Sequence, residues 1–357
     1  MPVVRRHLSF VSIILPALIG IALSSGCASQ RPTDNAFDAP HSISAREYGY
    51  VRPAADVRVI GRDGGIVSTG SGGDLWDRVR RGRHLDVAHH SRVDRAVQSL
   101  RRDPQYLTGL SQRARPYLHM IVGELERNGL PAELALLPEI ESRYNARAVS
   151  PMSATGMWQF MPYTGKKMGL KQNSWYDGRN DILASTRGAI AYLKLLNDEF
   201  DGDWALTLAA YNAGPARVRA AQDINKARGK PTDFWSLNLP AETEYYVPKF
   251  LAVATLVRDP RHYGLSMPRI ENQPHLELVE SRSQIDLAHA ARICGVPVST
   301  LRNLNPGLKR GKTLPDGPHR VLVPAGTGAK LRTALAKSGD LLAPAVAARS
   351  DRGGQDG

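Results

Sequence analysis

Apolar residues recur at helical spacing through the middle of the chain. Between Arg115 and Asn128 they return every three or four positions, and Gly129 follows the last of them. This spacing predicts an amphipathic helix that ends at the glycine. Similar patterns predict helices from Asp181 to about Glu199, from Trp204 to Tyr211 and from Thr243 to Arg258. The central part of the chain is therefore expected to be mainly α-helical.

Two weaker segments precede this region. A short helix is expected to begin near Asp74, and the stretch from Leu85 to Leu100 is polar with a weak apolar stripe. Both are expected to pack on the flank of the helical core. Residues 27–73 are rich in Ser, Gly, Pro, Asp and Arg and keep no helical period. That composition is typical of a flexible tether.

The segment before Ser142 combines helix signals with two prolines. Pro131 suits the first turn of a helix, where its missing N–H costs nothing, and Glu133 complements the positive end of the helix dipole. Pro138 lies inside the same expected helix and removes one hydrogen bond, so we expect a kink there.

Two glutamates near the end of this helix are expected to face opposite sides. Projected at about 100° per residue, Glu141 falls beside Leu134 and Leu137, whereas Glu139 falls on the far side. Apolar neighbours disfavour an ionised carboxyl and raise its pKa, as a general acid working near neutral pH requires. Taken alone, Glu141 also fits a solvated residue at a helix end.

Beyond the helical region the pattern changes to short alternating elements. Strands are expected at residues 276–279 and 321–324, and short helices at 283–294 and 298–304. Asn305-Pro306-Gly307 forms a turn before the last strand. The resulting order is βααβ.

This βααβ order resembles a LysM-type carbohydrate-binding module, and Asn305-Pro306 matches that module's Asn-Pro step. We place the module at residues 268–325. Because a fold does not establish a function, a purely structural appendage remains the alternative. Residues 326–357 are rich in Ala, Gly, Arg and Asp and are expected to form a mobile tail.

The N-terminal residues have the layout of an export signal. Arg5 and Arg6 precede a short apolar run, which Ser24-Ser25-Gly26-Cys27 follows. The run is short for a membrane span. The ending resembles a bacterial lipoprotein signal at residues 1–26, with Cys27 acylated and anchoring the chain. Ala28 after the cysteine points, by resemblance to sorting signals, to the periplasmic face of the outer membrane.

Composition narrows the possible partners. The chain of 357 residues carries a formal net charge of +13, which favours an anionic partner. No nucleic-acid-binding motif accompanies this charge, so nucleic acid is not expected. There are two cysteines; with Cys27 lipidated, no intramolecular disulfide can form, and Cys294 is expected to be a small buried hydrophobe. His89 and His90 lack a third ligand at metal spacing, so no metal site is expected.

Four motifs follow one another through the helical region. They are Glu141-Ser142, ATGMWQFMP at 154–162, AAYNAG at 209–214 and ETEYYV at 242–247. Their order resembles the signature of the soluble-type lytic transglycosylases, which cleave peptidoglycan and share the fold of goose-type lysozyme. The similarity runs from about residue 75 to 264, and GKKMGL, DEFDGDW and TDFWSLNLPAETE resemble one membrane-bound branch of that family.

The resemblance implies a lysozyme-like catalytic domain at residues 74–267, with its core at about 116–260, and no cofactor. Glu141 would cleave the β-1,4 bond between N-acetylmuramic acid and N-acetylglucosamine, first as acid and then as base, to leave a 1,6-anhydromuramoyl product. Gly156 is expected to serve backbone geometry, and Trp158 is expected either to line the cleft or to fill the core. The implied substrate-binding residues are Ser142, Met157, Gln159, Phe160, Tyr211, Asn212 and Tyr246.

Two other functions fit parts of the sequence. A goose-type muramidase would hydrolyse the same bond, yet the segment from Glu141 to Met161 offers no second acid to hold a nucleophilic water. A lipoprotein that binds the cell wall without catalysis would need the cleft but not Glu141. The presence of Glu141 with its neighbours favours the enzyme. The expected partners are peptidoglycan glycan strands and, through the lipid, a membrane.

Overall fold

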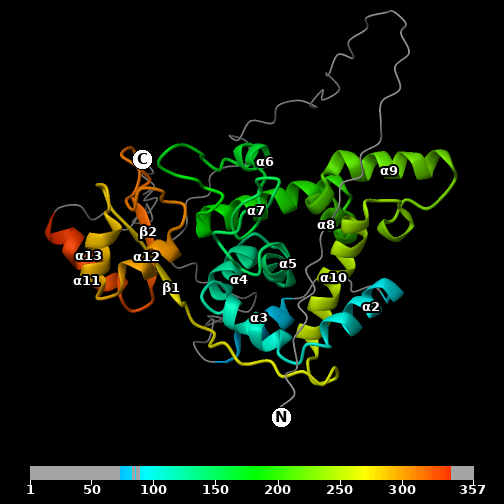
Figure 1. Cartoon of the computed structure of the whole chain (residues 1–357), viewed down its shortest axis with the longest axis horizontal. Helices are drawn as coiled ribbons and strands as arrows, with labels where there is room; N and C mark the ends of the chain where they lie inside the picture. The colour runs from blue at the N-terminus through cyan, green and yellow to red at the C-terminus, as the bar shows by residue number, and fades with distance from the viewer. Residues whose placement is uncertain (1–72, 83–84, 86–88, 339–357) are drawn as a thin grey trace, which may run out of the picture. The chain divides into compact units, whose positions relative to one another are not determined.

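The computed structural model describes residues 73–82, 85 and 89–338, and Figure 1 shows how their helices and strands are arranged. The expected export signal, lipid site and most of the tether lie outside these residues. All of the described residues belong to one unit, Ala45–Gly357. Its first part is entirely helical and contains α1 (Leu75–Arg81), α2 (Ser91–Leu100), α3 (Tyr106–Ala114), α4 (Leu118–Arg127), η1 (Ala132–Leu136), α5 (Leu137–Glu141), α6 (Pro162–Lys167), α7 (Ile182–Glu199), α8 (Trp204–Ala213), α9 (Pro215–Ala227), η2 (Phe234–Ser236) and α10 (Ala241–Arg258).

Local capping chemistry fixes the starts of the longest helices. The Asp181 carboxylate accepts a hydrogen bond from the N–H of Ala184 at 2.7 Å, so it caps α7 at the start predicted for this helix. Asp203 caps α8 in the same way through the N–H of Leu206 at 2.9 Å. Gly214 ends α8 with a φ of 88°, and Pro215 then occupies the first turn of α9. The starts of α7 and α8 therefore agree with the starts predicted from the sequence.

The core lies where α10 packs against α2 and α8, while α7 packs against α8 (Figure 1). Helix α10 is buried along most of its length, and its interior Pro248 does not end it. At the start of α2, His90 caps the helix through Nδ1 and stacks on Trp235 with ring centroids 3.9 Å apart. Helix α2 thus begins at Ser91, later than the expected stretch from Leu85.

The helix before Ser142 differs from the prediction. Instead of one kinked helix there are two short ones, η1 and α5, and Leu136 is the residue that precedes α5. Pro138 lies in the first turn of α5 rather than inside a longer helix. Its missing N–H falls where no hydrogen bond is lost, because the first residues of a helix have no partner within it. Helix α3 was not predicted, since its apolar stripe is short.

The second part is a small module that contains β1 (Leu276–Glu280), α11 (Leu287–Cys294), α12 (Val298–Leu304), β2 (Arg320–Pro324) and α13 (Gly328–Lys337). The two strands pair antiparallel, with Leu278 opposite Leu322. The βααβ order is confirmed, and Cys294 is buried as expected. The mobile tail expected from residue 326 is wrong for α13, whose Leu331 is buried as the helix packs against β1 and α11.

Candidate active site

Glu141 is the last residue of α5, and its half-buried carboxyl meets a hydroxyl from α10. The phenol of Tyr246 donates a hydrogen bond to Oε1 of Glu141. Both residues belong to the expected site, and the two are 105 positions apart in the chain. The fold therefore brings the first and the fourth motif together.

Burial raises the pKa of Glu141 from 4.5 to about 7. Glu242, near the start of α10, contributes in the same direction, because a second negative charge disfavours ionisation. The hydrogen bond from Tyr246 and the positive charge of Lys249 lower the pKa and oppose these effects. Near neutral pH Glu141 therefore exists in both protonation states, as a group that first donates and then recovers a proton requires.

Glu139 lies on the other side of α5, as the helical projection indicated, but it is not a solvated residue. It is 4% exposed, and Arg113 of α3 holds it through Nη2–Oε1 at 2.6 Å and Nε–Oε2 at 3.2 Å. The charge of Glu139 is thus compensated, whereas no cation pairs directly with Glu141 in the part of the chain that the structure describes. The two glutamates have distinct roles: Glu139 anchors α5, and Glu141 faces Tyr246.

The turn that follows Gly156 supplies main-chain atoms to the same site. The Ser142 hydroxyl donates to the carbonyl of Met157 at 2.8 Å, and the Tyr211 hydroxyl donates to the carbonyl of Trp158 at 2.9 Å. Gln159 has a φ of 48°, and its side-chain amide donates to the carbonyl of Gly156 at 2.8 Å. Ser142, Tyr211 and Gln159 thus hold this turn in place beside α5.

Three residues of the turn do not line an open cleft. Trp158, Met157 and Phe160 are at most 3% exposed, and Trp158 Nε1 donates to the buried Thr186 hydroxyl at 3.0 Å. The side chains of Met157 and Phe160, which the resemblance implied to be substrate-binding, are therefore turned away from any open cleft, and Trp158 fills the core. Large apolar side chains gain most by leaving water, so the turn folds them inward and presents its main chain instead.

Asn212, at the end of α8, is held by two neighbours on α10. The Thr243 hydroxyl donates to Oδ1 of Asn212 at 2.7 Å, and Asn212 Nδ2 donates to Glu242 at 3.4 Å. This contact fixes the orientation of the Asn212 amide beside the residue that also affects the pKa of Glu141. Sequence reasoning missed Thr243 and Glu242 as site residues, although both stand within the fourth motif.

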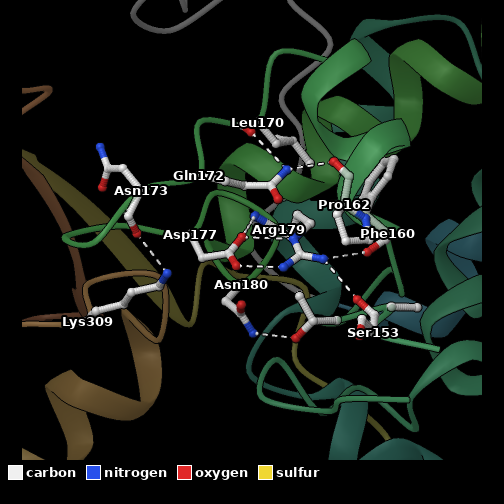
Figure 2. A network of polar contacts seen from close by, with 12 residues as sticks. Ser153, Phe160, Pro162, Leu170, Gln172, Asn173, Asp177, Arg179, Asn180 and Lys309 are labelled. Atoms are coloured by element: carbon white, nitrogen blue, oxygen red, sulfur yellow. Dashed lines mark hydrogen bonds and ion pairs between the residues drawn. The ribbon is translucent and has the colours of Figure 1, made fainter. Parts of the chain in front are cut away.

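Figure 2 shows a second group of residues that the sequence did not reveal. Arg179 forms an ion pair with Asp177 at 2.8 Å and donates to the carbonyl of Ser153 at 3.0 Å and that of Phe160 at 3.3 Å. Asn180 donates to the carbonyl of Ala146 at 2.9 Å. These residues precede α7 and hold both ends of the segment between α5 and α6. No motif marked them, because the main-chain carbonyls that they hold lie 19 to 34 positions away in the sequence.

Gly156 lies in the segment that Arg179 and Asn180 hold, and it packs closely against Arg179. Its φ is 86°, and a Cβ added there would lie 2.0 Å from the carbonyl oxygen of Arg179. Only glycine combines this backbone conformation with this approach. The expected backbone role of Gly156 is therefore accounted for by two independent constraints.

The Asn305-Pro306-Gly307 turn of the small module contacts the same region. The Asn305 side chain is buried and exchanges hydrogen bonds with the main chain of Leu322, each 2.8 Å long. The N–H of Asp177 donates to the carbonyl of Gly307 at 3.0 Å. Lys309 Nζ donates to the carbonyl of Asn173 at 2.8 Å (Figure 2). This turn is thus occupied by structural contacts within the module and with the loop before α7.

Comparisons with known proteins match the helical part and the small module to two domain families. The transglycosylase SLT domain family matches residues 120–234, and the LysM-like domain of the lytic transglycosylase MltD matches residues 275–340. The membrane-bound lytic murein transglycosylase D of Escherichia coli (strain K12) is 38% identical over 326 residues, which cover 91% of this chain and 71% of that protein. The chain belongs to the lytic murein transglycosylases. It is similar to the D type, as the branch-specific phrases indicated.

Other relatives of this lytic murein transglycosylase share shorter regions. A putative tributyltin chloride resistance protein from Alteromonas sp. (strain M-1) is 38% identical over 178 residues, or 49% of this chain and 84% of that protein. Among solved structures, an inactive variant of the lytic transglycosylase Slt from Pseudomonas aeruginosa aligns with a TM-score of 0.35 and 24% identity. That alignment covers 53% of this chain and 32% of the other.

Proposed function

We propose that this transglycosylase cleaves the β-1,4 bond between N-acetylmuramic acid and N-acetylglucosamine with Glu141 as both acid and base. Protonated Glu141 donates its proton to the bridging oxygen, and the N-acetyl oxygen of the substrate supports C1 in place of a second carboxylate. Ionised Glu141 then accepts the proton of the muramoyl C6 hydroxyl as that oxygen closes on C1. The product is a 1,6-anhydro sugar, and no water is consumed.

The observation that carries this proposal is the pKa of about 7 at Glu141, in contact with the hydroxyl of Tyr246. A hydrogen bond from a phenol favours the ionised carboxyl, and burial favours the protonated one, so their balance keeps both forms accessible. Ser142, Gln159, Tyr211 and the main chain of the 156–160 turn would contact or orient the sugar residues. Asn212, held by Thr243, would present its amide to the substrate.

Hydrolysis of the same bond is the competing reaction, and the position of Glu242 is the observation in its favour. Glu242 is an acid that the fold brings near enough to raise the pKa of Glu141, although it lies outside the segment from Glu141 to Met161. An inverting mechanism would use such a second carboxylate to activate water. In the anhydro mechanism Glu242 has no proton to transfer.

Replacing each glutamate separates the two mechanisms. Glu141→Gln keeps the shape of the side chain but cannot donate and recover a proton. Because acid and base roles are each worth about 10²–10⁴-fold, turnover should fall to the detection limit. Glu242→Gln should retain most turnover. Mass spectrometry of digested sacculi should show a muramoyl product that is lighter by one water than the hydrolytic product. Finding only the hydrated product, with turnover lost in Glu242→Gln, would establish a muramidase instead.

We propose a division into a lipoprotein signal at 1–26, a tether at 27–73, the catalytic domain at 74–267 and the LysM-like module. In view of α13, the module extends beyond the expected residue 325. Its β1, β2 and helix pair would support the binding of glycan strands. A pulldown of residues 268–340 with purified peptidoglycan tests this role, and no retention at moderate salt would leave the module a structural one.

A relative and the N-terminal sequence support a location in the cell envelope. The similar protein is described as membrane-bound, and in the described ranges of this chain no helix is long and apolar enough to cross a bilayer. We propose that acylation of Cys27 anchors the enzyme in the cell envelope, at the periplasmic face of the outer membrane. Several acyl chains on one residue give stable attachment, which a single chain does not. Cys27→Ser should abolish acyl labelling and leave an unprocessed precursor; unchanged labelling and fractionation would exclude this anchor.

A further inference from the structure

A cleft of about 420 Å³ lies between the catalytic domain and the LysM-like module. Arg147 and Ser153 line it from the segment after Glu141, Asn180 lines it from the loop before α7, and Pro306 and Lys309 line it from the module. The cleft is separate from the contacts of the Glu141 carboxyl. Neither the sequence motifs nor the proposed acid and base chemistry assigns it a role.

Of the three cationic side chains that line this cleft, one is paired with a carboxylate and two are not. Arg179 also lines it, but its guanidinium is already paired with Asp177. Arg147 and Lys309 are exposed, and among the described residues their side chains donate only to main-chain carbonyls, those of Arg302 at 2.6 Å and Asn173 at 2.8 Å. Neither has a carboxylate at ion-pair distance within residues 73–82, 85 and 89–338. The cleft therefore carries two positive charges that no described side chain neutralises.

This cleft and the catalytic residues share one segment of chain. Arg147 follows Glu141 by six positions, so the two α-carbons are at most about 20–22 Å apart. Ser153 lines the cleft, and Gln159 of the same segment belongs to the turn that Ser142 holds beside Glu141. An extended peptide spans about 3.3–3.6 Å per residue. A peptide of about six residues that branches from a sugar at Glu141 therefore spans even the largest possible separation from Arg147, and Lys309 lines the same cleft as Arg147.

The shape and chemistry of the cleft favour a peptide over a membrane surface. Its walls are concave and combine the two cations with polar groups from Ser153 and Asn180. An extended chain with a carboxylate can enter such a cleft and present N–H and C=O groups to its walls. Lipid headgroups in a flat bilayer would need cations on a protruding surface. The stem peptides of peptidoglycan are extended chains that carry the required carboxylates.

We propose that this cleft binds the carboxylate-bearing stem peptide of the glycan strand, with Arg147 and Lys309 as its anchoring cations. The inference rests on the proposed function, because it takes the peptide from the substrate that Glu141 cleaves. Binding of the stem peptide in this cleft makes the junction between the two domains a specificity site, which distinguishes peptide-bearing glycan from bare glycan. The module thus contributes Lys309 to substrate selection.

The test measures binding without turnover, in the otherwise full chain carrying Glu141→Gln. Calorimetric titration compares glycan fragments of equal length with and without their stem peptides. Combined Arg147→Ala and Lys309→Ala should weaken binding of the peptide-bearing fragment about threefold to tenfold, as loss of two exposed ion pairs implies. Binding of the bare fragment should not change, and the difference should shrink as salt is raised.

Matched variants distinguish charge from structure. Arg147→Lys with Lys309→Arg keeps both charges and should keep the affinity for the peptide-bearing fragment. Lys230→Ala removes an exposed cation outside the cleft and should change neither affinity. Equal weakening for both fragments in the double alanine variant would show that the cations only hold the junction together. No weakening for either fragment would also overturn the proposal.

Two further measurements complete the test. Vesicles with anionic phospholipid should bind the double alanine variant as well as they bind the parent; a loss on vesicles alone would assign the cations to a lipid surface and overturn the proposal. The anhydro product is assayed separately in the chain that retains Glu141. Its absence would refute the acid and base mechanism, whereas the titrations would still report whether the cleft recognises the peptide.

Discussion

Two glutamates of one short helix should respond in opposite directions when each is replaced by glutamine. Folding raises the pKa of Glu141 from 4.5 to about 7, so the folded chain holds its proton more tightly than the unfolded chain does. The stability that this proton provides is fully present below about pH 4.5 and is lost as the pH rises through about 7. At 1.36 kcal/mol per pH unit, the loss amounts to about 3 kcal/mol.

Glu141→Gln removes the charge and keeps an oxygen that can accept the Tyr246 hydrogen bond. At pH 8.5 the variant should therefore be more stable than the parent by up to about 3 kcal/mol, and at pH 5 by less than about 1 kcal/mol. For a domain of about 200 residues, 3 kcal/mol corresponds to a rise in Tm of about 6–12 °C. The gain in stability should accompany the loss of turnover, because the proposed chemistry uses the same carboxyl that burial desolvates.

Glu139→Gln is the matched comparison, two positions earlier. It breaks the ion pair with Arg113, whose side chain is 24% exposed while that of Glu139 is 2% exposed. Leaving a fully buried partner uncompensated costs about 3–5 kcal/mol, and the partial exposure of Arg113 reduces this to about 1–3 kcal/mol. Stability should fall at both pH values. Glu139→Gln is therefore not a neutral control for activity, although Glu139 lies on the far side of the helix from Glu141 as predicted.

The assay is thermal and urea unfolding of the three chains at pH 5 and pH 8.5. Stabilisation by Glu141→Gln at pH 8.5 that exceeds its effect at pH 5 supports the reasoning. A Tm that is unchanged or lower at pH 8.5, or one that rises equally at both pH values, would show that burial does not raise the pKa of Glu141. Stabilisation by Glu139→Gln would show that the pair with Arg113 is not needed.

Three further variants, and Gly202→Ala as a control for one of them, test the neighbourhood of the site and the module. Tyr246→Phe removes a donor that lowers the pKa of Glu141, so the alkaline limb of the kcat/KM profile should move up by about one pH unit or more; an unmoved limb contradicts this role. Gly156→Ala should cost at least about 3 kcal/mol of stability, because a strained φ and a 2.0 Å approach combine there. Gly202→Ala has a similar φ of 84° with open space around it, and should cost only about 1–2 kcal/mol in the same unfolding experiment. Asn305→Ala removes hydrogen bonds to buried main-chain groups and should lower the unfolding free energy by about 2–4 kcal/mol; an unchanged Tm of the module would contradict this.

Local signals were sufficient for most of the elements. Asp181 as a cap, and Gly214 followed by Pro215, set helix boundaries through interactions within a few residues of the chain. The alternation of apolar and polar residues likewise predicted β1, β2 and the two helices between them. The short helix α13 was missed because compositional bias concealed its apolar stripe of Leu331 and Leu335.

The sequence by itself pointed to Glu141 as the candidate acid and predicted the side of α5 on which it lies, because helical geometry depends only on spacing. Only the tertiary structure decided that Tyr246 meets it across 105 positions, and that Arg113 compensates Glu139 across 26. It also decided that Met157 turns into the core and that Asp177 contacts the module at Gly307. The pKa of a carboxyl depends on the surfaces and charges packed around it. Those come from distant segments, and no local pattern records which of them will meet.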